Sequence, residues 1–346
     1  MDTDRSAPAR DHTGRMPEPA RPDFDPPKLS TRLPPGARRA FGDLLPILDL
    51  PGARDLLIQV TGRTGRAWVD RAGALQAVPG WRASPERVRR LAVDLVSAGN
   101  RQLDELHPCA DVAIGAGVRV HAVLPPICVA GAAVSIRLPA AAQPQLHRLI
   151  EAGLCSGRIA DELTALVPDR RNVLISGGTG SGKTTLLGAL LDEAPPGERV
   201  VTIEDVAELR LRRENWVALE ARTPNAEGSG AVSLDRLLRE SLRMRPDRIA
   251  LGECRGAEVS TLLAALNTGH DGSAGTVHAN RLGDLPARLE ALGALAGLNP
   301  GALGRQAVAA FHTFVHLERG PDGRQCVGAI GRPVLARDRL EIGPLR

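Results

Sequence analysis

The chain has 346 residues, of which 43% are apolar and 24% are charged, and its formal net charge at pH 7 is +4. This composition is typical of a globular protein with a sizeable core. The small net charge excludes a chain-wide electrostatic attraction to nucleic acid or to an anionic membrane.

The cysteines and the N-terminal sequence bear on the cellular compartment. The five cysteines form no CxxC pair and no even framework, which is typical of reduced thiols and argues against a structural zinc site. The N-terminus carries acids and prolines where a signal peptide has an apolar core, and no apolar stretch approaches the roughly 18 to 20 residues of a membrane span. We therefore expect a cytoplasmic protein.

Residues 1–37 differ in composition from the rest of the chain. They contain eight prolines and scattered charge, with almost no clustered apolar side chains. Such a segment buries too little surface to offset the entropy lost on ordering. We predict a disordered tail rich in proline and arginine.

Residues 38–138 predict a smaller, N-terminal α+β domain, followed by a linker over 139–150. A helix is expected where Ser84 is the N-cap and Pro85 occupies the first helical position. The expected elements are strands at 55–60 and 66–73, the helix from 85 to its stop at Gly99, and two or three strands within 110–138 that glycines and Pro125–Pro126 interrupt.

The second half, residues 151–346, alternates between strand and helix patterns. Continuous apolar runs predict buried strands, and leucines at helical spacing, such as Leu234, Leu238 and Leu242, predict helices between them. This alternation predicts an α/β fold with a mostly parallel sheet covered on both faces. Residues 311–335 indicate only a small strand-turn-strand tail. The apolar runs lie at 171–176, 199–203, 248–251 and 275–278.

Residues 177–184, GGTGSGKT, fit the pattern G-x-x-x-x-G-K-[ST] and lie between a predicted strand and a predicted helix, as a phosphate-binding P-loop requires. Glycines let backbone N–H groups form a nest around the β-phosphate, and the helix N-terminus adds partial positive charge. Lys183 then reaches the β- and γ-phosphates, and Thr184 offers its hydroxyl to Mg²⁺. The predicted nucleotide-binding residues are Gly177, Gly178, Thr179, Gly180, Ser181, Gly182, Lys183, Thr184 and Thr185.

Lysine at position 183 has a physical explanation. The chain has 44 basic residues, and only Lys183 and Lys28 among them are lysines. A P-loop nest is narrow, so it favours a compact ammonium over a wide, planar guanidinium.

Hydrolysis also needs carboxylates near the metal and the attacking water. Glu253 follows the apolar run 249–251 at the carboxyl end of a predicted strand, where ligands bind in open α/β sheets, and we assign it to orient or activate water. A surface ion pair with Arg255 is the structural alternative. Glu204 and Asp205 end another strand. They either hold the metal through water or stabilise the N-terminus of a helix.

Two histidines, His270 and His278, lie at the ends of a glycine-rich turn and a short strand in NTGHDGSAGTVHAN. A lone histidine is more often a structural hydrogen-bonding residue, and a separation of eight residues does not resemble a metal pair on one helix. The spacing alone leaves their roles open.

Four segments, taken in order, resemble the Walker A, Asp box, Walker B and His box of the type II/IV secretion ATPase superfamily: GGTGSGKTT, TIEDVAEL, LRMRPDRIALGECRG and NTGHDGSAGTVHAN. The similarity favours the CpaF/TadA branch, the pilus-assembly and conjugal-transfer-associated ATPases. It covers residues 40–300 through further segments, GVRVHAVLPP, VSIRLP and EARTPNAEG. Cys254 and Ala274–Gly275 depart from the usual boxes without removing a catalytic group. The tetracysteine zinc element of the type II secretion members is absent.

This resemblance implies a hexameric ring motor, in which a variable N-terminal domain precedes a RecA-like P-loop core and nucleotide binds between them. It implies a catalytic role for His278. The arginines that match phosphate-contacting positions are Arg222, Arg239 and Arg243, and those that match positions near the interdomain linker and the nucleotide are Arg119 and Arg137. A solvated helix face would also explain Arg239 and Arg243.

The sequence thus predicts a Mg²⁺-dependent ATPase, and the resemblance implies that hydrolysis drives domain movement between subunits. The resemblance implies that it powers pilus assembly or export through integral membrane platform proteins, peripheral to the cytoplasmic face of the membrane. The alternatives are a nucleic-acid motor in conjugal DNA transfer and a nucleotide-binding scaffold with low turnover. Three Trp, four Phe and no Tyr argue against nucleic acid as a direct ligand, and Glu253 argues against the scaffold.

Overall fold

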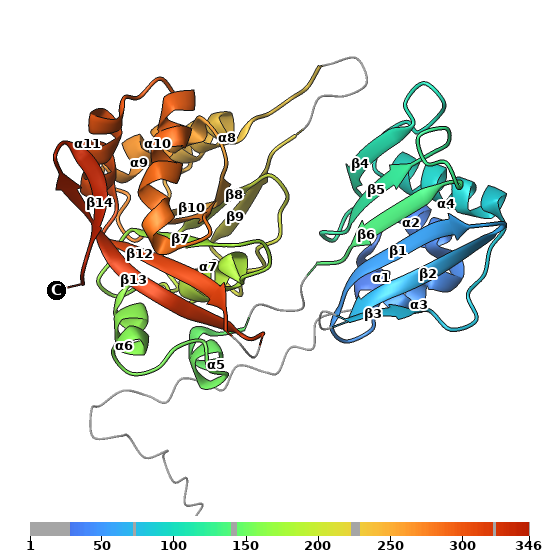
Figure 1. Ribbon diagram of the computed structural model, residues 1–346, viewed down its shortest axis with the longest axis horizontal. Coiled ribbons are helices and arrows are strands. Elements are labelled where there is room, and N and C mark those ends of the chain that lie inside the picture. Colours follow the sequence, from blue (N-terminus) through green and yellow to red (C-terminus); the bar gives the residue numbers. More distant parts are fainter. Residues whose placement is uncertain (1–27, 72–73, 140–143, 223–228, 321–322, 346) are drawn as a thin grey trace, which may run out of the picture.

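The computed structural model describes residues 28–71, 74–139, 144–222, 229–320 and 323–345, and it contains two large sheets, each with its own helices (Figure 1). We call residues 28–139 the N-terminal half and residues 144–345 the C-terminal half. Within the described ranges, no helix is long and apolar enough to cross a membrane.

The N-terminal half is an antiparallel sheet of six strands in the order β3-β2-β1-β6-β5-β4. The longest helix of this half, α4, follows its predicted start, because the Ser84 hydroxyl accepts a hydrogen bond from the Arg87 N–H at 3.3 Å. The strands are β1 Ala53–Thr61, β2 Thr64–Arg71, β3 Ala74–Ala77, β4 Cys109–Ala113, β5 Arg119–Val123 and β6 Ala133–Arg137. The helices are α1 Leu29–Arg32, α2 Pro35–Phe41, η1 Gly42–Leu44, α3 Leu45–Leu48 and α4 Pro85–Ala98.

The predicted tail extends too far. Residues 1–27 lie outside the described part of the chain, but residues 28–37 belong to the N-terminal half and include α1 and the start of α2. Leu33, Ala37 and Phe41 recur at a spacing of four, and all three are buried in the core of this half. Pro35 lies at the first position of α2, where a proline starts a helix instead of breaking it.

The C-terminal half is built on an eight-stranded sheet in the order β14-β13-β12-β7-β11-β10-β8-β9. The strands from β12 to β9 are parallel, as predicted, and β13 and β14 add antiparallel. The strands are β7 Val173–Gly177, β8 Val200–Glu204, β9 Trp216–Glu220, β10 Arg248–Cys254, β11 Ala274–His278, β12 Thr313–Arg319, β13 Gln325–Ala336 and β14 Arg339–Gly343.

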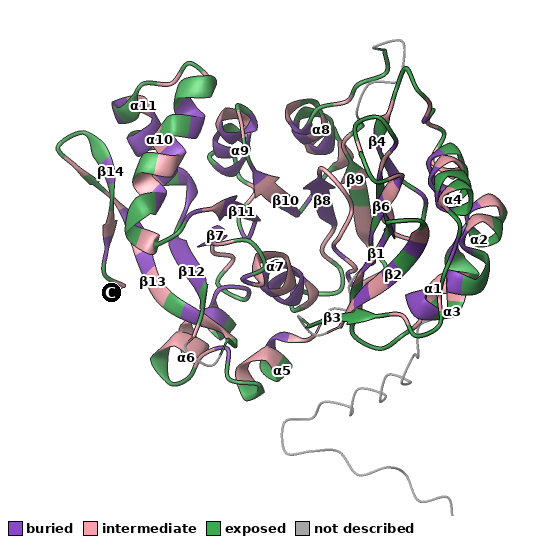
Figure 2. Cartoon of the chain, turned by 45° about the vertical axis from the view of Figure 1, so that its right-hand side comes forward, coloured by how far each residue is buried: buried purple, intermediate pink, exposed green. Residues whose placement is uncertain are grey.

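Helices cover both faces of this sheet, and its central strands are buried between them (Figure 2). One face carries α5 Leu146–Glu151, α6 Arg158–Ala165 and α7 Lys183–Asp192. The other carries α8 Leu234–Ser241, η2 Leu242–Met244, α9 Glu258–Leu266, η3 Leu282–Asp284, α10 Leu285–Leu295 and α11 Pro300–Ala310. The expected parallel sheet with two covered faces is confirmed.

Two boundaries in this half differ from the prediction. Residues 140–143 of the linker lie outside the described part, but α5 begins at Leu146, which is buried in the core beside α7. The predicted strand-turn-strand tail is part of the main sheet, because β12 lies parallel to β7 with Thr313 to Leu317 opposite Val173 to Gly177. Its apolar run is buried like those of the other central strands.

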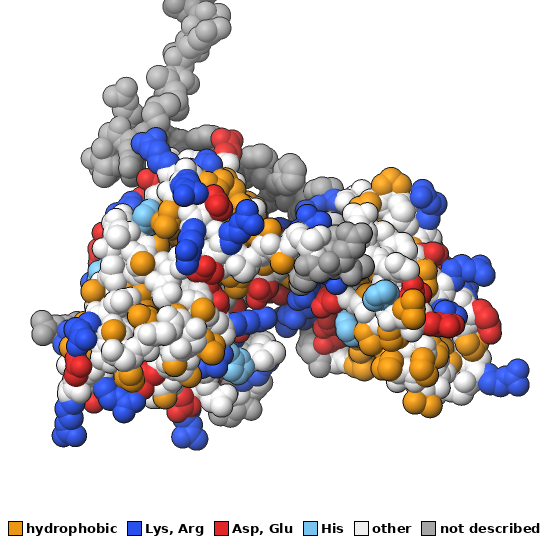
Figure 3. Space-filling view, turned by 90° about the horizontal axis from the view of Figure 1, so that it is seen from above, with side chains coloured by type: hydrophobic (Ala, Val, Ile, Leu, Met, Phe, Trp, Pro, Cys, Tyr) orange, Lys and Arg blue, Asp and Glu red, His pale blue; other side chains and the backbone are white. Residues whose placement is uncertain are grey.

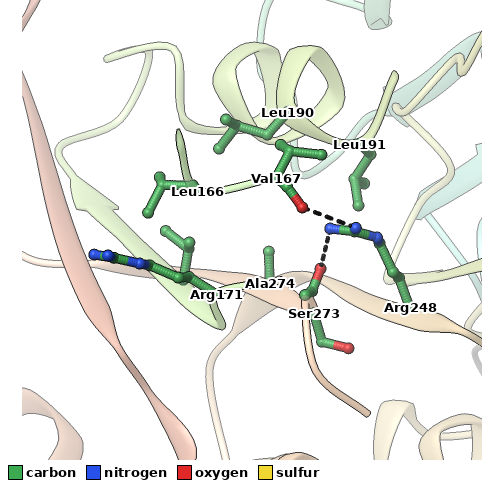
Figure 4. Close-up of a pocket in the computed structure, with 10 residues that line it drawn as sticks. Leu166, Val167, Arg171, Leu190, Leu191, Arg248, Ser273 and Ala274 are labelled. Atoms are coloured by element: carbon green, nitrogen blue, oxygen red, sulfur yellow. Dashed lines mark hydrogen bonds between the residues drawn. The ribbon is translucent and has the colours of Figure 1, made fainter. Parts of the chain in front are cut away.

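A buried arginine joins three segments at the amino edge of the sheet, opposite the edge where the P-loop lies (Figure 4). Arg248 donates to the Val167 carbonyl at 3.0 Å and to the Gly272 carbonyl at 3.2 Å, and it forms an ion pair with Glu198. The adjoining cavity has a volume of about 10 Å³, which is roughly the space of one water molecule. It is too small for a nucleotide, so the role of this cluster is structural.

Candidate functional site

The segment after β7 has the backbone of a P-loop. β7 ends at Gly177 and α7 begins at Lys183, so the glycine-rich residues form the turn between them. Gly180 and Gly182 have φ of 71° and 97°, in the left-handed region that glycine adopts without strain. The geometry predicted from the glycine spacing is therefore present.

Polar groups face the inside of this loop. The Lys183 ammonium donates to the carbonyls of Gly177 at 2.9 Å and Gly178 at 2.8 Å, and partial burial lowers its pKa. The Ser181 N–H makes only a long hydrogen bond of 3.4 Å to the Gly178 carbonyl. Within the described residues, the buried Ser181 hydroxyl has no hydrogen-bond partner. Incompletely satisfied donors around a cationic side chain fit an anion such as a phosphate chain.

The predicted catalytic residues lie at the same edge of the sheet. Glu204, Glu253 and His278 are at or next to the carboxyl ends of β8, β10 and β11, and His278 is directly opposite Gly177 of the P-loop strand. The Glu253 carboxylate lies close enough to Lys183 to oppose the lowering of its pKa. Parallel strands thus bring three distant segments of sequence to the P-loop.

Glu253 forms an ion pair with Arg255, as expected if its role were structural. Arg255 donates to the Glu253 carboxylate at 2.7 Å and also pairs with Asp205 at 3.3 Å. The Arg255 side chain is 61% exposed and that of Glu253 26% exposed, so this pair is accessible to water and contributes little stability. Glu253 therefore keeps access to solvent at the edge where the γ-phosphate of a nucleotide would lie.

Glu204 is placed differently from the expectation of a metal ligand. It is buried, and its carboxylate accepts hydrogen bonds from the backbone N–H groups of Glu208 and Leu209 at 3.1 to 3.3 Å. Burial raises its pKa to about 7, against the opposing effect of these hydrogen bonds. A carboxylate that is turned toward the backbone does not fit the predicted metal role. In the described ranges, no group of three or more His, Cys, Asp or Glu is arranged to hold a metal ion.

Thr184 fits the metal role better than Glu204. It lies in the first turn of α7 beside Lys183, and its side chain is only partly buried. Mg²⁺ in nucleotide sites is usually held by one or two protein oxygens together with phosphate oxygens and water, so a cluster of carboxylates is not required.

The structure does not bring the predicted arginines to the P-loop. Arg239 and Arg243 pair with the acids Asp235 and Glu240, one turn away on the same helical segment, and their side chains are 67% and 79% exposed. These are the contacts of a solvated helix face. Arg222 is exposed and forms a backbone bridge with Val232.

Arg119 and Arg137 are paired residues on β5 and β6 of the N-terminal half. Arg119 binds Asp111 at 3.3 Å on its own sheet. Arg137 reaches Glu208 of the C-terminal half at 3.8 Å. Figure 3 shows acidic and basic side chains gathered where the two halves face each other.

His270 has the structural role that spacing left open. Its ring binds the Ala265 carbonyl at the end of α9, and its own carbonyl accepts from the Ser273 hydroxyl. These contacts close the turn between α9 and β11.

Sequence reasoning missed two residues at the site. The Arg319 guanidinium and the Gln325 amide both donate to the Gly180 carbonyl of the P-loop, at 3.1 and 2.8 Å. Nothing in the local pattern of residues 311–335 indicates this contact, because it depends on β12 pairing with β7.

Comparisons with known proteins agree with this geometry. Residues 108–310 match the model of the family described as type II/IV secretion system protein. The chain is 45% identical over 306 residues to a putative conjugal transfer protein of Mycobacterium tuberculosis, covering 87% of this chain and 86% of that protein. It is 35% identical over 268 residues to the conjugal transfer protein TrbB of Rhizobium radiobacter, with 75% and 79% covered.

Two solved structures share the fold. The Legionella pneumophila ATPase DotB aligns with a TM-score of 0.57 at 21% identity, covering 85% of this chain and 79% of that one. The pilus retraction motor PilT with bound ADP aligns with a TM-score of 0.56 at 20% identity, covering 85% and 80%.

Proposed function

Because the chain belongs to the type II/IV secretion system protein family, we propose that it is an ATP-hydrolysing motor of a secretion or pilus machine. The P-loop with Lys183 turned into it is the observation that carries this proposal. The fold supports it, since the chain shares its architecture with proteins named as an ATPase and as a pilus retraction motor.

Each residue at the carboxyl edge of the sheet has its own part in the transfer of a phosphoryl group from ATP to water. The backbone N–H groups of the P-loop, the N-terminus of α7 and Lys183 would bind the phosphates of ATP. Thr184 would hold Mg²⁺, which would supply positive charge to the phosphate oxygens. Glu253 orients the attacking water, because it lies at the end of β10 next to the P-loop and remains partly exposed. His278 lies opposite Gly177 and adds a further polar side chain at the carboxyl edge of the sheet.

We further assign the chain to the CpaF/TadA branch, as one subunit of a homohexameric ring whose two halves are separate domains with nucleotide between them. The partners are integral membrane platform proteins, contacted from the cytoplasmic face. The box sequences support this assignment. Ring formation places arginines of one subunit, such as Arg222 and Arg243, at the phosphates of its neighbour.

A nucleic-acid motor is the second candidate, because relatives are named as conjugal transfer proteins. The scarcity of aromatic side chains counts against it, since proteins that bind single strands stack bases on such rings. ATPase assays with single-stranded DNA and, separately, with the cytoplasmic domains of platform proteins distinguish the two. Stimulation of ATPase activity by DNA, and not by the platform-protein domains, would favour the nucleic-acid motor.

The basic test is steady-state hydrolysis of Mg-ATP by the wild type and by Glu253→Gln. We expect the variant to bind nucleotide but to lose about 10² or more in turnover, because the amide keeps the size and removes the charge that orients water. Glu214→Gln is the matched control, since this exposed acid precedes β9 at the opposite edge of the sheet. Wild-type protein without ATPase activity would refute the function, and an active Glu253→Gln would exclude Glu253 from the chemistry.

A further inference from the structure

The hairpin formed by β12 and β13 contacts the P-loop at one carbonyl group. The Gly180 oxygen accepts hydrogen bonds from Arg319 Nη2 at 3.1 Å and from Gln325 Nε2 at 2.8 Å. Arg319 also donates through Nη1 to the Gly323 carbonyl at 2.9 Å, so its guanidinium joins the hairpin turn to the P-loop. A carbonyl oxygen has two lone pairs, and both have a donor here.

These two bonds fix the direction of the next N–H group. The peptide unit from Gly180 to Ser181 is planar and trans, so its N–H points away from its carbonyl. With the carbonyl held by the hairpin on the outside, the Ser181 N–H points into the loop, where it makes a hydrogen bond of 3.4 Å to the Gly178 carbonyl. Lys183 donates to that same carbonyl at 2.8 Å. The bonds made by the hairpin therefore orient a donor toward the position of the phosphates.

The hairpin is itself held firmly against the P-loop strand. β12 pairs with β7 along Thr313 to Leu317, and the buried His316 ring lies 3.0 Å from the Ser176 hydroxyl, one residue before the loop. The fit extends to Gly182, where a Cβ atom would come within 2.8 Å of the Gln325 side-chain oxygen. The position of the two donors relative to the loop is thus set by the sheet.

We propose that Arg319 and Gln325 are positioning residues, which hold the P-loop in its phosphate-binding conformation before nucleotide arrives. The proposal rests on the proposed ATPase function for its effect on catalysis, and on the geometry of the free protein for the positioning itself. Its consequence is that nucleotide affinity depends on the hairpin, whereas activation of water by Glu253 does not.

The variants Arg319→Ala, Gln325→Ala and the double variant test this dependence. Each single change removes one of two bonds to the Gly180 carbonyl, so we expect the Kd for a fluorescent ADP analogue and the KM for ATP to rise about five- to ten-fold. The double variant weakens binding more than either, and kcat changes by less than about three-fold. Arg319→Lys keeps one cationic donor and recovers part of the affinity.

The matched control is Arg332→Ala. Arg332 is also an arginine of the hairpin that donates to a backbone carbonyl, but its partner is Pro344, at the end of the chain. We expect this variant to bind nucleotide as the wild type does. Equal weakening in Arg332→Ala and Arg319→Ala would overturn the specific role of the Gly180 contact.

Hydrogen exchange of the nucleotide-free protein separates positioning from simple loss of structure. Among the described contacts, Ser181 is the residue of 178–182 whose N–H makes a hydrogen bond, so Arg319→Ala should speed exchange of the Ser181 amide while the amides of 313–317 in β12 remain protected. Unchanged exchange in the P-loop, or equal loss of protection in β12, would overturn the inference even in a protein that hydrolyses ATP. Wild-type protein that lacks ATPase activity would refute the function instead, and the exchange result would still decide the positioning.

Discussion

Lys183 shows how a single residue reports on a site. Arginine carries nearly all of the positive charge of this chain, but position 183 has a lysine. Its ammonium fits inside the P-loop and donates to the carbonyls of Gly177 and Gly178. Burial lowers its pKa and Glu253 opposes that effect, so the side chain lies within a polar, partly enclosed edge of the sheet. A guanidinium is wider, stays planar and cannot occupy the same space.

We therefore predict that Lys183→Arg is nearly as damaging to ATP hydrolysis as Lys183→Ala. The arginine either displaces the γ-phosphate or swings out of the loop, and misplacement by about 1 Å costs roughly 10² in rate. Folding is retained, because arginine has a similar helix propensity to lysine at this first position of α7. The measurements are steady-state turnover and the thermal midpoint of both variants. Turnover above about a third of the wild-type value would contradict the geometric argument.

The P-loop, Glu253, Glu204 and His278 could be located from sequence because each lies in a short segment whose own pattern shows a strand end. Arg319 and Gln325 could not, since they lie 139 and 145 residues from the Gly180 that they contact. The direction of the Glu204 side chain could not be predicted from the sequence either. A strand-end acid can face the metal or the following loop, and only the course of residues 205–209 decides between them.

At the scale of elements, local pattern identified the parallel strands and helices but not which strands are neighbours. The segment from β12 to β13 has an ordinary strand pattern, and its place beside β7 comes from tertiary pairing. The start of the chain also shows that local pattern does not determine the structure. Its prolines suggested a tail through residue 37, although apolar residues at helical spacing pack α2 against α4.

The loop after β8 depends on a buried acid. Glu204 ends β8 and binds the N–H groups of Glu208 and Leu209, and a Cβ atom on Gly252 of β10 would come within 2.6 Å of its Cγ atom. The side chain therefore links two strand ends to the loop that reaches the N-terminal half. Because burial disfavours the charged form, this link is sensitive to pH.

We predict that Glu204 lowers the stability of the protein as the pH rises. Its pKa is about 7 in the folded state against 4.5 in the unfolded state, so between these values the folded protein binds more protons. The free energy of unfolding therefore falls from pH 4.5 to 7, by on the order of 3 kcal/mol if this group acts alone. Glu204→Gln does not titrate.

The measurement is the thermal midpoint of the wild type and of Glu204→Gln at pH 5, 6, 7 and 8. The stability of the wild type relative to the variant should decline across this series and level off above pH 7. Parallel curves would show that the Glu204 carboxyl does not change its protonation in this window.

At the scale of the whole molecule, the ion pair of Arg137 and Glu208 joins the two halves of the described chain. Arg137 and Glu208 are 3.8 Å apart with side chains 63% and 41% exposed, a pair of little energetic weight. Arg210 of the same loop packs against Gly117, where a Cβ atom would clash with its guanidinium. Both contacts involve the loop that Glu204 holds, so residues 205–210 connect this edge of the sheet to the N-terminal half.

The proposed ring leads to a test by mixing subunits. Arg243 pairs only with Glu240 on its own helical segment among the contacts described, so we expect it to act on the phosphates of a neighbouring subunit. Arg243→Ala and Lys183→Ala should each lose about 10² in ATPase activity when alone. An equal mixture restores sites in which an intact P-loop faces an intact Arg243, in about a quarter of the interfaces of a randomly assembled ring.

The matched control is a mixture of Lys183→Ala and Glu253→Gln. Both residues belong to the same site within one chain, since Glu253 acts electrostatically on Lys183, so no combination of these two subunits contains a complete site. Light scattering with an ATP analogue should show about six subunits in every sample. A particle that stays monomeric at all concentrations contradicts the ring, and an Arg243→Ala variant with full activity contradicts any role for this arginine. If the first mixture is no more active than the control, Arg243 does not act across the interface. Its role is then that of an exposed side chain on the solvated helix face seen in the single chain.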